Sequence, residues 1–296
     1  MTARRHADPL APEKEGAGLR FLYHTAFGRL ILKALTARWI SRAAGAFMNT
    51  RASKIFIKPF VRSAGIDLGD YVTDGFSCFN DCFTRQIKPG LRAFDPDPAA
   101  LCAPCDGLLT VYAIGDDPSA TVFPAKQSEY SVATLLGDAK EAARFAGGYA
   151  LVFRLCVQHY HRYAFFDGGE KKPGKFIPGR LHTVRPIALA ACPVFTENCR
   201  EATFIDTENF GTAAEVEIGA MLVGRIANER GDESFHVRRG EEKGMFLYGG
   251  STVVLLLGRG AAGIDAEILE ASANALETPV KMGERIGSAK QGASRS

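Results

Sequence analysis

Short apolar runs separated by turn residues are the feature that most constrains the fold of this chain. From about residue 70 onward they have the length of strands and are rich in Val, Ile, Leu and aromatic residues, with Gly, Pro and Asp between them. The clearest are LLTVYAI, YALVFRLCV, AEVEIGAMLVGRI and STVVLLL. One stretch, SVATLLGDAKEAARFAGG, instead predicts a helix with Ser131 as its N-cap. We therefore predict an α+β fold with a β-rich core, for which the 46% apolar content is ample.

The segment before this core has a different pattern. Between Arg20 and Arg62 there are nine Lys or Arg residues, and the acidic residues resume only at Asp67. Apolar residues recur there on one face of a predicted helix: Phe27, Leu30, Ile31, Ala34, Leu35 and Trp39. A basic amphipathic helix with an aromatic apolar face is typical of a segment that lies on an anionic membrane surface. The alternative is a helix packed on the core with its basic residues in solvent.

These patterns predict four parts of the chain: a flexible arm at 1–19, a basic helical membrane-association segment at 20–66, a β-rich domain at 67–280 and a tail at 281–296. No apolar run reaches the roughly 18 residues that span a bilayer, and no secretory signal is visible, so we expect peripheral membrane contact. The net charge of +3 does not point to nucleic acid, and we expect no nucleic-acid partner.

Four of the cysteines have a spacing that is compatible with a metal site. The chain has seven cysteines, an odd number that favours free thiols. Cys78 and Cys82 lie four apart, and Cys102 and Cys105 form a C-x-x-C pair, a pattern compatible with zinc. No histidine spacing of the metal-binding kind supports it, and we predict no metal.

Few residues of the core can carry acid–base chemistry. The motif QHYHRY places His159 and His161 two positions apart after an apolar run, and two such residues on a strand would share a face. They could bind a metal, or one could act as a base, although a single histidine is usually structural. Asp106 lies in an Asp-Gly turn, which is commonly structural as well.

The stretch GGST at 249–252 is the most unusual feature. Glycine permits backbone conformations closed to other residues, so Ser251 could approach and attack its own preceding peptide bond if a base removes its hydroxyl proton. Asp106, His161 and Ser251 supply the residue types of such a relay, although their spacing alone does not show that they meet. Two other readings are a non-enzymatic membrane-binding β domain, in which GGST only begins a strand, and a serine hydrolase, which would lack a G-x-S-x-G elbow.

Several separated stretches together resemble the phosphatidylserine decarboxylase family. They cover roughly residues 70–260 in order: FTRQIKPGLRAFD, APCDGLL, YSVATLLG, HYHRY, FTENCRE, DTENFGTAAEVEIGAMLVGRI and KGMFLYGGSTVVLLL. The resemblance implies a proenzyme cut between Gly250 and Ser251 into a β chain and an α chain, with Asp106, His161 and Ser251 as the relay. It also implies that Ser251 becomes a covalent pyruvoyl cofactor, which forms a Schiff base with the amine of phosphatidylserine and acts as an electron sink for loss of CO2.

The same resemblance implies the partners of the chain. They are phosphatidylserine, the cytoplasmic face of the cell membrane through residues 20–62 and, as an expectation that the residues do not fix, a second copy of the chain. Another serine-headed phospholipid is the alternative substrate. The motif departs from the family at Ala164, where many members have a second histidine, and at His159, where Asp is common. His161 is therefore our first choice of base and His159 the alternative.

Overall fold

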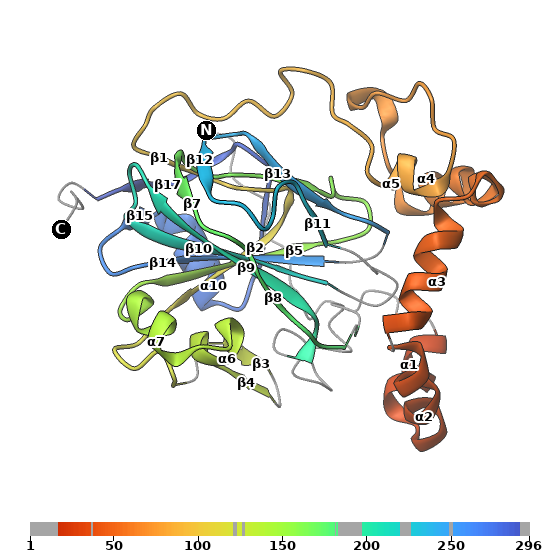
Figure 1. Ribbon diagram of the computed structural model, residues 1–296, viewed down its shortest axis with the longest axis horizontal. Helices are drawn as coiled ribbons and strands as arrows, with labels where there is room; N and C mark the ends of the chain where they lie inside the picture. Colours follow the sequence, from red (N-terminus) through yellow and green to blue (C-terminus); the bar gives the residue numbers. More distant parts are fainter. Residues whose placement is uncertain are drawn as a thin grey trace.

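The computed structural model describes residues 17–36, 38–120, 123–125, 128–180, 182, 197–219, 226–248 and 251–290. It confirms the predicted α+β class, with antiparallel sheets at the centre and helices at the N-terminus (Figure 1). Most of the predicted arm, residues 1–16, and the last six residues of the predicted tail lie outside the described residues.

Helices precede the sheets and then recur between the strands. The α-helices are α1 (Ala17–His24), α2 (Ala26–Leu35), α3 (Arg38–Met48), α4 (Ile57–Ala64), α5 (Phe79–Phe83), α6 (Val132–Leu136), α7 (Ala139–Ala142) and α10 (Ala266–Ala273). The described ranges also contain three short 3₁₀ helices: η1 (Arg51–Phe56), η2 (Leu68–Asp70) and η3 (Ala143–Phe145).

The largest sheet has nine strands, all paired antiparallel, in the order β12-β7-β9-β10-β14-β5-β2-β16, with β8 also paired to β9. Its strands are β2 (Gly107–Ala113), β5 (Tyr149–Leu155), β7 (Gly169–Lys171), β8 (Lys175–Ile177), β9 (Arg200–Thr207), β10 (Thr212–Ile218), β12 (Phe235–Val237), β14 (Ser251–Leu257) and β16 (Thr278–Val280).

Smaller sheets complete the β structure. The order β1-β17-β15 joins β1 (Ala100–Cys102), β17 (Arg285–Ala289) and β15 (Ala262–Ile264). The order β11-β13-β6 joins β11 (Ile226–Asn228), β13 (Glu242–Phe246) and β6 (Arg162–Ala164), and β3 (Phe123–Ala125) pairs with β4 (Ser128–Tyr130).

Strand β14 lies in the middle of the large sheet, and all seven of its residues are buried. Its side chains alternate between two apolar clusters, Val253 and Leu255 in one and Val254 and Leu256 in the other. The first cluster lies between the large sheet and α10 with the small sheet β1-β17-β15, and the second beneath α6, α7 and η3. Burial on both faces explains why STVVLLL reads as an uninterrupted apolar run instead of an alternating one.

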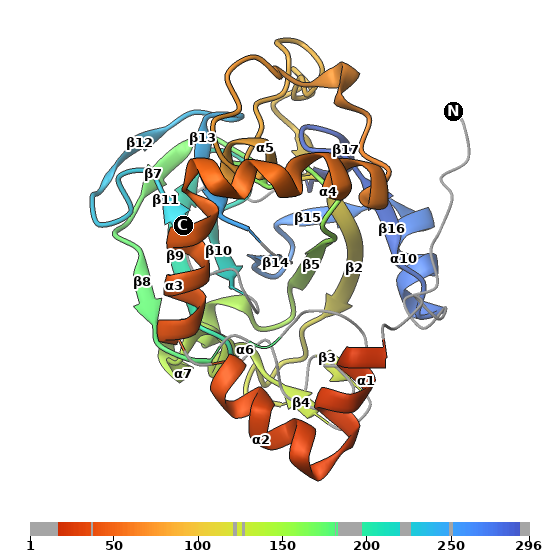
Figure 2. The same cartoon turned by 90° about the vertical axis from the view of Figure 1, so that its right-hand side faces the viewer.

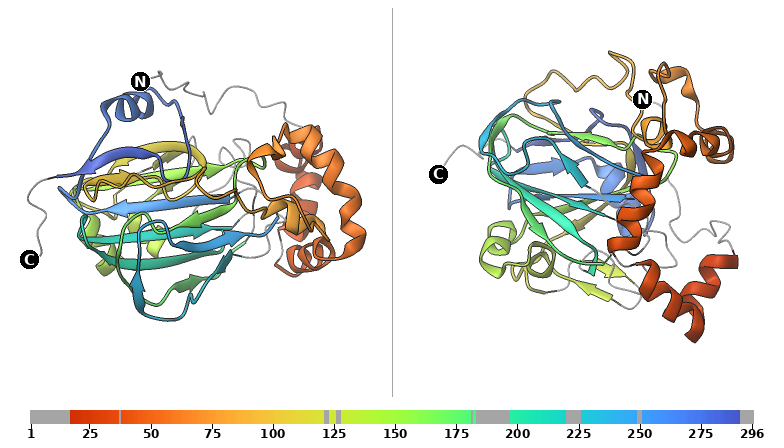
Figure 3. Two further views of the ribbon diagram at one scale, coloured as in Figure 1. Left: turned by 90° about the horizontal axis from the view of Figure 1, so that it is seen from above. Right: turned by 45° about the vertical axis from the view of Figure 1, so that its right-hand side comes forward.

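Helices α1 to α4 stack at one end of the large sheet (Figures 2 and 3). The predicted helical character of 20–66 is therefore confirmed, although the segment is broken into several helices. Leu32 on α2 and Tyr23 on α1 are buried in the first apolar cluster, whereas Phe27 and Leu30 are 66% and 63% exposed. Of the predicted apolar face, Phe27 and Leu30 are therefore exposed, and Ile31 and Leu35 are half-buried.

Two boundary predictions differ from the structure. The β-rich domain is predicted to end at residue 280, but 285–289 form β17, which pairs with β1 and β15, so the folded sheet continues into the predicted tail. The single helix predicted after Ser131 is split at Gly137, which takes a left-handed conformation that ends α6. Ser131 does cap α6, because its hydroxyl accepts a hydrogen bond from the Thr134 N–H.

Candidate active site

Ser251 is the first residue of β14 and is fully buried. Its backbone pairs with Leu155 of β5, so the sheet fixes its position. Its Oγ lies 3.3 Å from Nδ1 of His161. The predicted cleavage partner Gly250, and Gly249 before it, lie outside the described residues. The structure thus brings together two of the three residues of the predicted relay, the serine and the first-choice histidine.

His161 lies in the turn between β5 and β6, not on a strand as the spacing argument assumed. Its Nε2 lies 3.2 Å from the carbonyl oxygen of Cys156. A carbonyl oxygen only accepts hydrogen bonds, so Nε2 carries the ring proton and Nδ1 presents its lone pair to Ser251. This is the tautomer that a base acting on the Ser251 hydroxyl requires.

The surroundings of His161 keep its imidazole uncharged. The ring is fully buried and stacks on Phe83 of α5, with ring centroids 4.2 Å apart. Burial lowers the pKa of His161 well below its usual range, and the nearby charges of His159 and Arg85 lower it further. A neutral imidazole is ready to accept a proton at neutral pH, which is the state that general-base chemistry needs.

The alternative base, His159, has a different hydrogen-bond partner. Its Nδ1 accepts a hydrogen bond of 3.0 Å from the Cys156 N–H, so that lone pair is occupied by the turn itself. Burial lowers the pKa of His159 to about 4, with Asp106 acting in the opposite direction. Within the described part of the chain, His161 is the histidine that contacts Ser251.

Asp106, the predicted third member of the relay, pairs with a different residue. Its two carboxylate oxygens accept hydrogen bonds of 2.8 Å from Nε and Nη2 of Arg92, and one also accepts from the Met282 N–H. Among the described residues, no hydrogen bond joins Asp106 to His161. The Cys156 carbonyl takes the orienting position that the resemblance assigns to the carboxylate.

A neutral base beside a buried hydroxyl can deprotonate that hydroxyl and direct it at a neighbouring carbonyl group. The dry surroundings favour such a reaction because water does not compete for the lone pair. A group derived from Ser251 also fits this place, because residue 251 pairs with Leu155 of β5 and Thr252 pairs with Ile218 of β10, so that the sheet would hold a new chain end there. The site can therefore support both a cleavage at residue 251 and a reaction of what remains there.

The four cysteines with zinc-compatible spacing do not form a set of metal ligands in the described structure. Cys78, Cys82, Cys102 and Cys105 are buried free thiols. In the ranges that the structure describes, no group of three His, Cys, Asp or Glu side chains is arranged to hold a metal ion.

Sequence reasoning missed Asn80, which binds the chain three residues before Ser251, and Arg85, which binds the turn that carries His161. The motif around FTR was noted only as a resemblance, and no role followed from it. The signal that could have drawn attention to it is a run of apolar residues that contains an asparagine and an arginine, because buried polar residues need specific partners.

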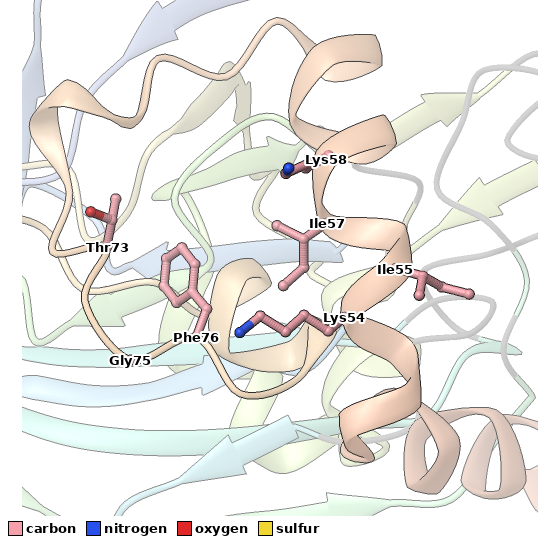
Figure 4. A pocket seen from close by; sticks show the side chains of 7 residues that line it. All are labelled: Lys54, Ile55, Ile57, Lys58, Thr73, Gly75 and Phe76. Carbon is pink, nitrogen blue, oxygen red and sulfur yellow. The ribbon is translucent and has the colours of Figure 1, made fainter.

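A groove lies outside this site, on the helical end of the molecule (Figure 4). It has a volume of about 580 Å³ and is formed by η1, the start of α4 and the loop before α5. Its lining residues are Lys54, Ile55, Ile57, Lys58, Thr73, Gly75 and Phe76. In Figure 4, Ile57 and Phe76 form an apolar wall and Lys54 extends beside Phe76. None of the helices in the described ranges is both long and apolar enough to cross a membrane.

Known proteins match this chain over most of its length. The family model of phosphatidylserine decarboxylase matches residues 79–288. Phosphatidylserine decarboxylase proenzyme 2 of Clostridium acetobutylicum is 42% identical over 271 residues, which are 91% of this chain and 91% of the relative. The proenzymes of Clostridium kluyveri and Fusobacterium nucleatum are 38% and 35% identical, over 91% and 93% of this chain and 91% and 92% of their own lengths.

Proposed function

The chain belongs to the phosphatidylserine decarboxylase family, and from that premise we propose that it is a self-processing enzyme that converts phosphatidylserine to phosphatidylethanolamine and CO2. The observation that supports this most directly is the buried pair of Ser251 Oγ and His161 Nδ1 at the start of the central strand. Such a pair has the geometry of a nucleophile and its base. The family to which the chain belongs makes it a carboxy-lyase.

The first step is the cut between Gly250 and Ser251. His161 Nδ1 takes the hydroxyl proton of Ser251, and Oγ attacks the carbonyl carbon of Gly250, so that the amide becomes an ester when the C–N bond breaks. Loss of the proton on Cα of residue 251 then expels the Gly250 carboxylate and leaves a dehydroalanine. Addition of water releases ammonia and leaves the pyruvoyl group at residue 251.

The pyruvoyl group supplies the electron sink for the loss of CO2 when the serine amine of the lipid is bound there. The residues of this chain hold that place in the sheet and exclude water from it. His161 is the titratable side chain that contacts residue 251 in the described structure, and it can move a proton to the product carbon. The Cys156 carbonyl holds the opposite edge of the imidazole throughout.

Helices α1 to α4 and η1 are the part of the protein that we expect to face the membrane. Phe27, Leu30 and Ile55 are exposed apolar side chains on these helices, at 66%, 63% and 72%. Lys54 and Lys58 border the groove, and no acidic residue lies between residues 20 and 66. Exposed apolar side chains with only basic neighbours suit the surface of an anionic bilayer. We therefore place the enzyme as a peripheral protein on the cytoplasmic face of the cell membrane, where its substrate lies.

The experiment is a CO2-release assay on vesicles that contain phosphatidylserine, with the wild-type protein and Ser251→Ala. The wild-type protein is expected to release CO2, and Ser251→Ala is expected to bind the vesicles without releasing any. Lipid binding without CO2 release by the wild-type protein would favour a non-enzymatic membrane-binding domain. The same assay with a panel of serine-headed phospholipids tests the alternative substrates, and sedimentation in detergent tests the expected homo-oligomer.

A further inference from the structure

Arg85 is a buried guanidinium that holds two segments together. It is 1% exposed, and its Nη2 donates hydrogen bonds to the carbonyl oxygens of Gln158 and His159, at 2.9 and 3.1 Å. Its Nη1 lies 3.4 Å from the carbonyl oxygens of Cys82 and Phe83 at the end of α5. No carboxylate in the described part of the chain pairs with it, and its Nε has no partner there. A buried cation without a counter-charge is costly, which indicates a role other than packing.

That role follows from what the Arg85 contacts hold. The turn at 156–161 carries the Cys156 carbonyl, which fixes the tautomer of His161, and Arg85 binds the same turn at residues 158 and 159. Phe83, two residues before Arg85, stacks directly on the imidazole. Arg85 and Phe83 therefore both act on the position of the His161 ring, one through its turn and the other by stacking.

Asn80 binds the chain segment just before Ser251. It is 3% exposed, and its Oδ1 accepts a hydrogen bond of 3.2 Å from the N–H of Tyr248, three residues before Ser251. Its Nδ2 donates to Asn49 Oδ1 at the end of α3, at 2.8 Å. The Tyr248 ring packs edge-on against Phe79 of α5, with ring centroids 4.8 Å apart. The chain that enters the cleavage site is thus fixed to α5.

We propose that residues 79–85 are the positioning element of self-cleavage, with Asn80 aligning the segment that leads to Ser251 and Arg85 aligning the turn that carries His161. The inference rests on the proposed function, because it concerns the same Ser251–His161 pair. This short segment contacts the His161 ring and the chain three residues before Ser251, although the two reacting residues are 90 positions apart in the sequence. Misplacement of a reacting pair by about 1 Å costs on the order of 100-fold in rate.

The same segment also contacts the N-terminal helices. The Phe79 N–H donates a hydrogen bond of 2.8 Å to Ser53 Oγ of η1, and the Phe60 ring of α4 packs against Phe79 with ring centroids 5.0 Å apart. Residues 79–85 therefore lie between the helices that we place on the membrane and the reacting pair.

The test measures self-cleavage after cell-free synthesis, as the ratio of intact to cut chain over time at a series of pH values. Arg85→Met removes both the hydrogen bonds and the charge, whereas Arg85→Lys keeps the charge. The titratable or charged groups that face His161 are His159 in its own turn and Arg85 from the segment after α5, while Ser251 from β14 and Phe83 from α5 are uncharged. Cleavage needs neutral His161, and the Arg85 charge favours that neutral form. Loss of the charge should therefore move the midpoint of the pH–rate profile to higher pH.

We expect Arg85→Met to slow cleavage roughly 10- to 100-fold and to raise the midpoint, and Arg85→Lys to slow it with the midpoint in place. Arg200→Lys is the matched control, because Arg200 is also buried and also binds backbone carbonyls, those of Thr134, Leu135 and Asn198. It should cleave like the wild-type protein. An equal loss in Arg200→Lys and Arg85→Lys at the same melting temperature would overturn the role of Arg85.

Asn80→Ala leaves the Tyr248 N–H without its acceptor and should slow cleavage about tenfold or more. Phe83→Leu keeps an apolar side chain of similar size but removes the stacking contact, and it should also slow cleavage. Wild-type rates in both variants would refute the positioning role of α5. A wild-type protein that does not cleave at all would instead refute the proposed function, so the two failures are distinguishable.

Discussion

Replacement of His161 tests whether this histidine is the base that deprotonates Ser251. Its Nδ1 is 3.3 Å from Ser251 Oγ, its tautomer is set by the Cys156 carbonyl, and its ring is neutral because it is buried. A positioned general base contributes about 10²- to 10⁴-fold to a rate. At 1.36 kcal/mol for each factor of ten, loss of this base should raise the barrier by about 3–5 kcal/mol. His161→Gln should therefore cleave about 10²- to 10⁴-fold more slowly than the wild-type protein.

The assay follows the appearance of the small chain on denaturing gels after synthesis, with His159→Gln as the matched control. His159 is two residues away, but its Nδ1 accepts from the backbone of its own turn instead of facing Ser251. Its replacement should change the rate of self-cleavage less than tenfold. His161 is not the base if His159→Gln stops cleavage while His161→Gln, with the same melting temperature, cleaves normally.

Three further changes test other parts of the account. Asp106→Asn should lower the free energy of unfolding by about 3–5 kcal/mol, measured by urea denaturation, because it leaves a buried guanidinium without its carboxylate. Burial raises the pKa of Glu217 to about 7, so its protonated form stabilises the fold at low pH, and that contribution should disappear as pH rises from about 4.5 to about 7. Glu217→Gln should flatten this part of the stability–pH curve, and an unchanged slope would contradict the assignment. Lys54→Glu with Lys58→Glu should weaken binding to phosphatidylserine vesicles about tenfold or more in a sedimentation assay at low salt, and Lys140→Glu on the distant α7 should not.

The architecture follows from the sequence to the extent that it depends on local pattern. The apolar run STVVLLL predicts a buried strand, and β14 is buried along its whole length. The basic stretch before residue 67 predicts helices, and α1 to α4 are there. The strand β17 was missed because five residues, RIGSA, with a glycine and a serine have no apolar pattern. Its pairing with β1 is a contact between distant parts of the chain, which composition cannot reveal.

The candidate site was predicted from residue types, and the partners of those residues depend on the fold. His161 and Ser251 are 90 positions apart, and only the sheet pairing of β14 with β5 brings the turn after β5 next to residue 251. Asp106 matches the expected residue type, but its carboxylate is bound by Arg92, and nothing in the local turn sequence encodes that partner. The roles of Asn80 and Arg85 likewise depend on which backbone groups the fold places around α5.

Ser251 is expected to cut the chain before itself, and the mass of the purified protein is the decisive measurement. Two chains are expected, a larger one that ends at Gly250 and a smaller one that begins at residue 251 with a pyruvoyl group and is therefore blocked to Edman degradation. Ser251→Ala should give one uncut and inactive chain. A single intact wild-type chain with full decarboxylase activity would contradict the account.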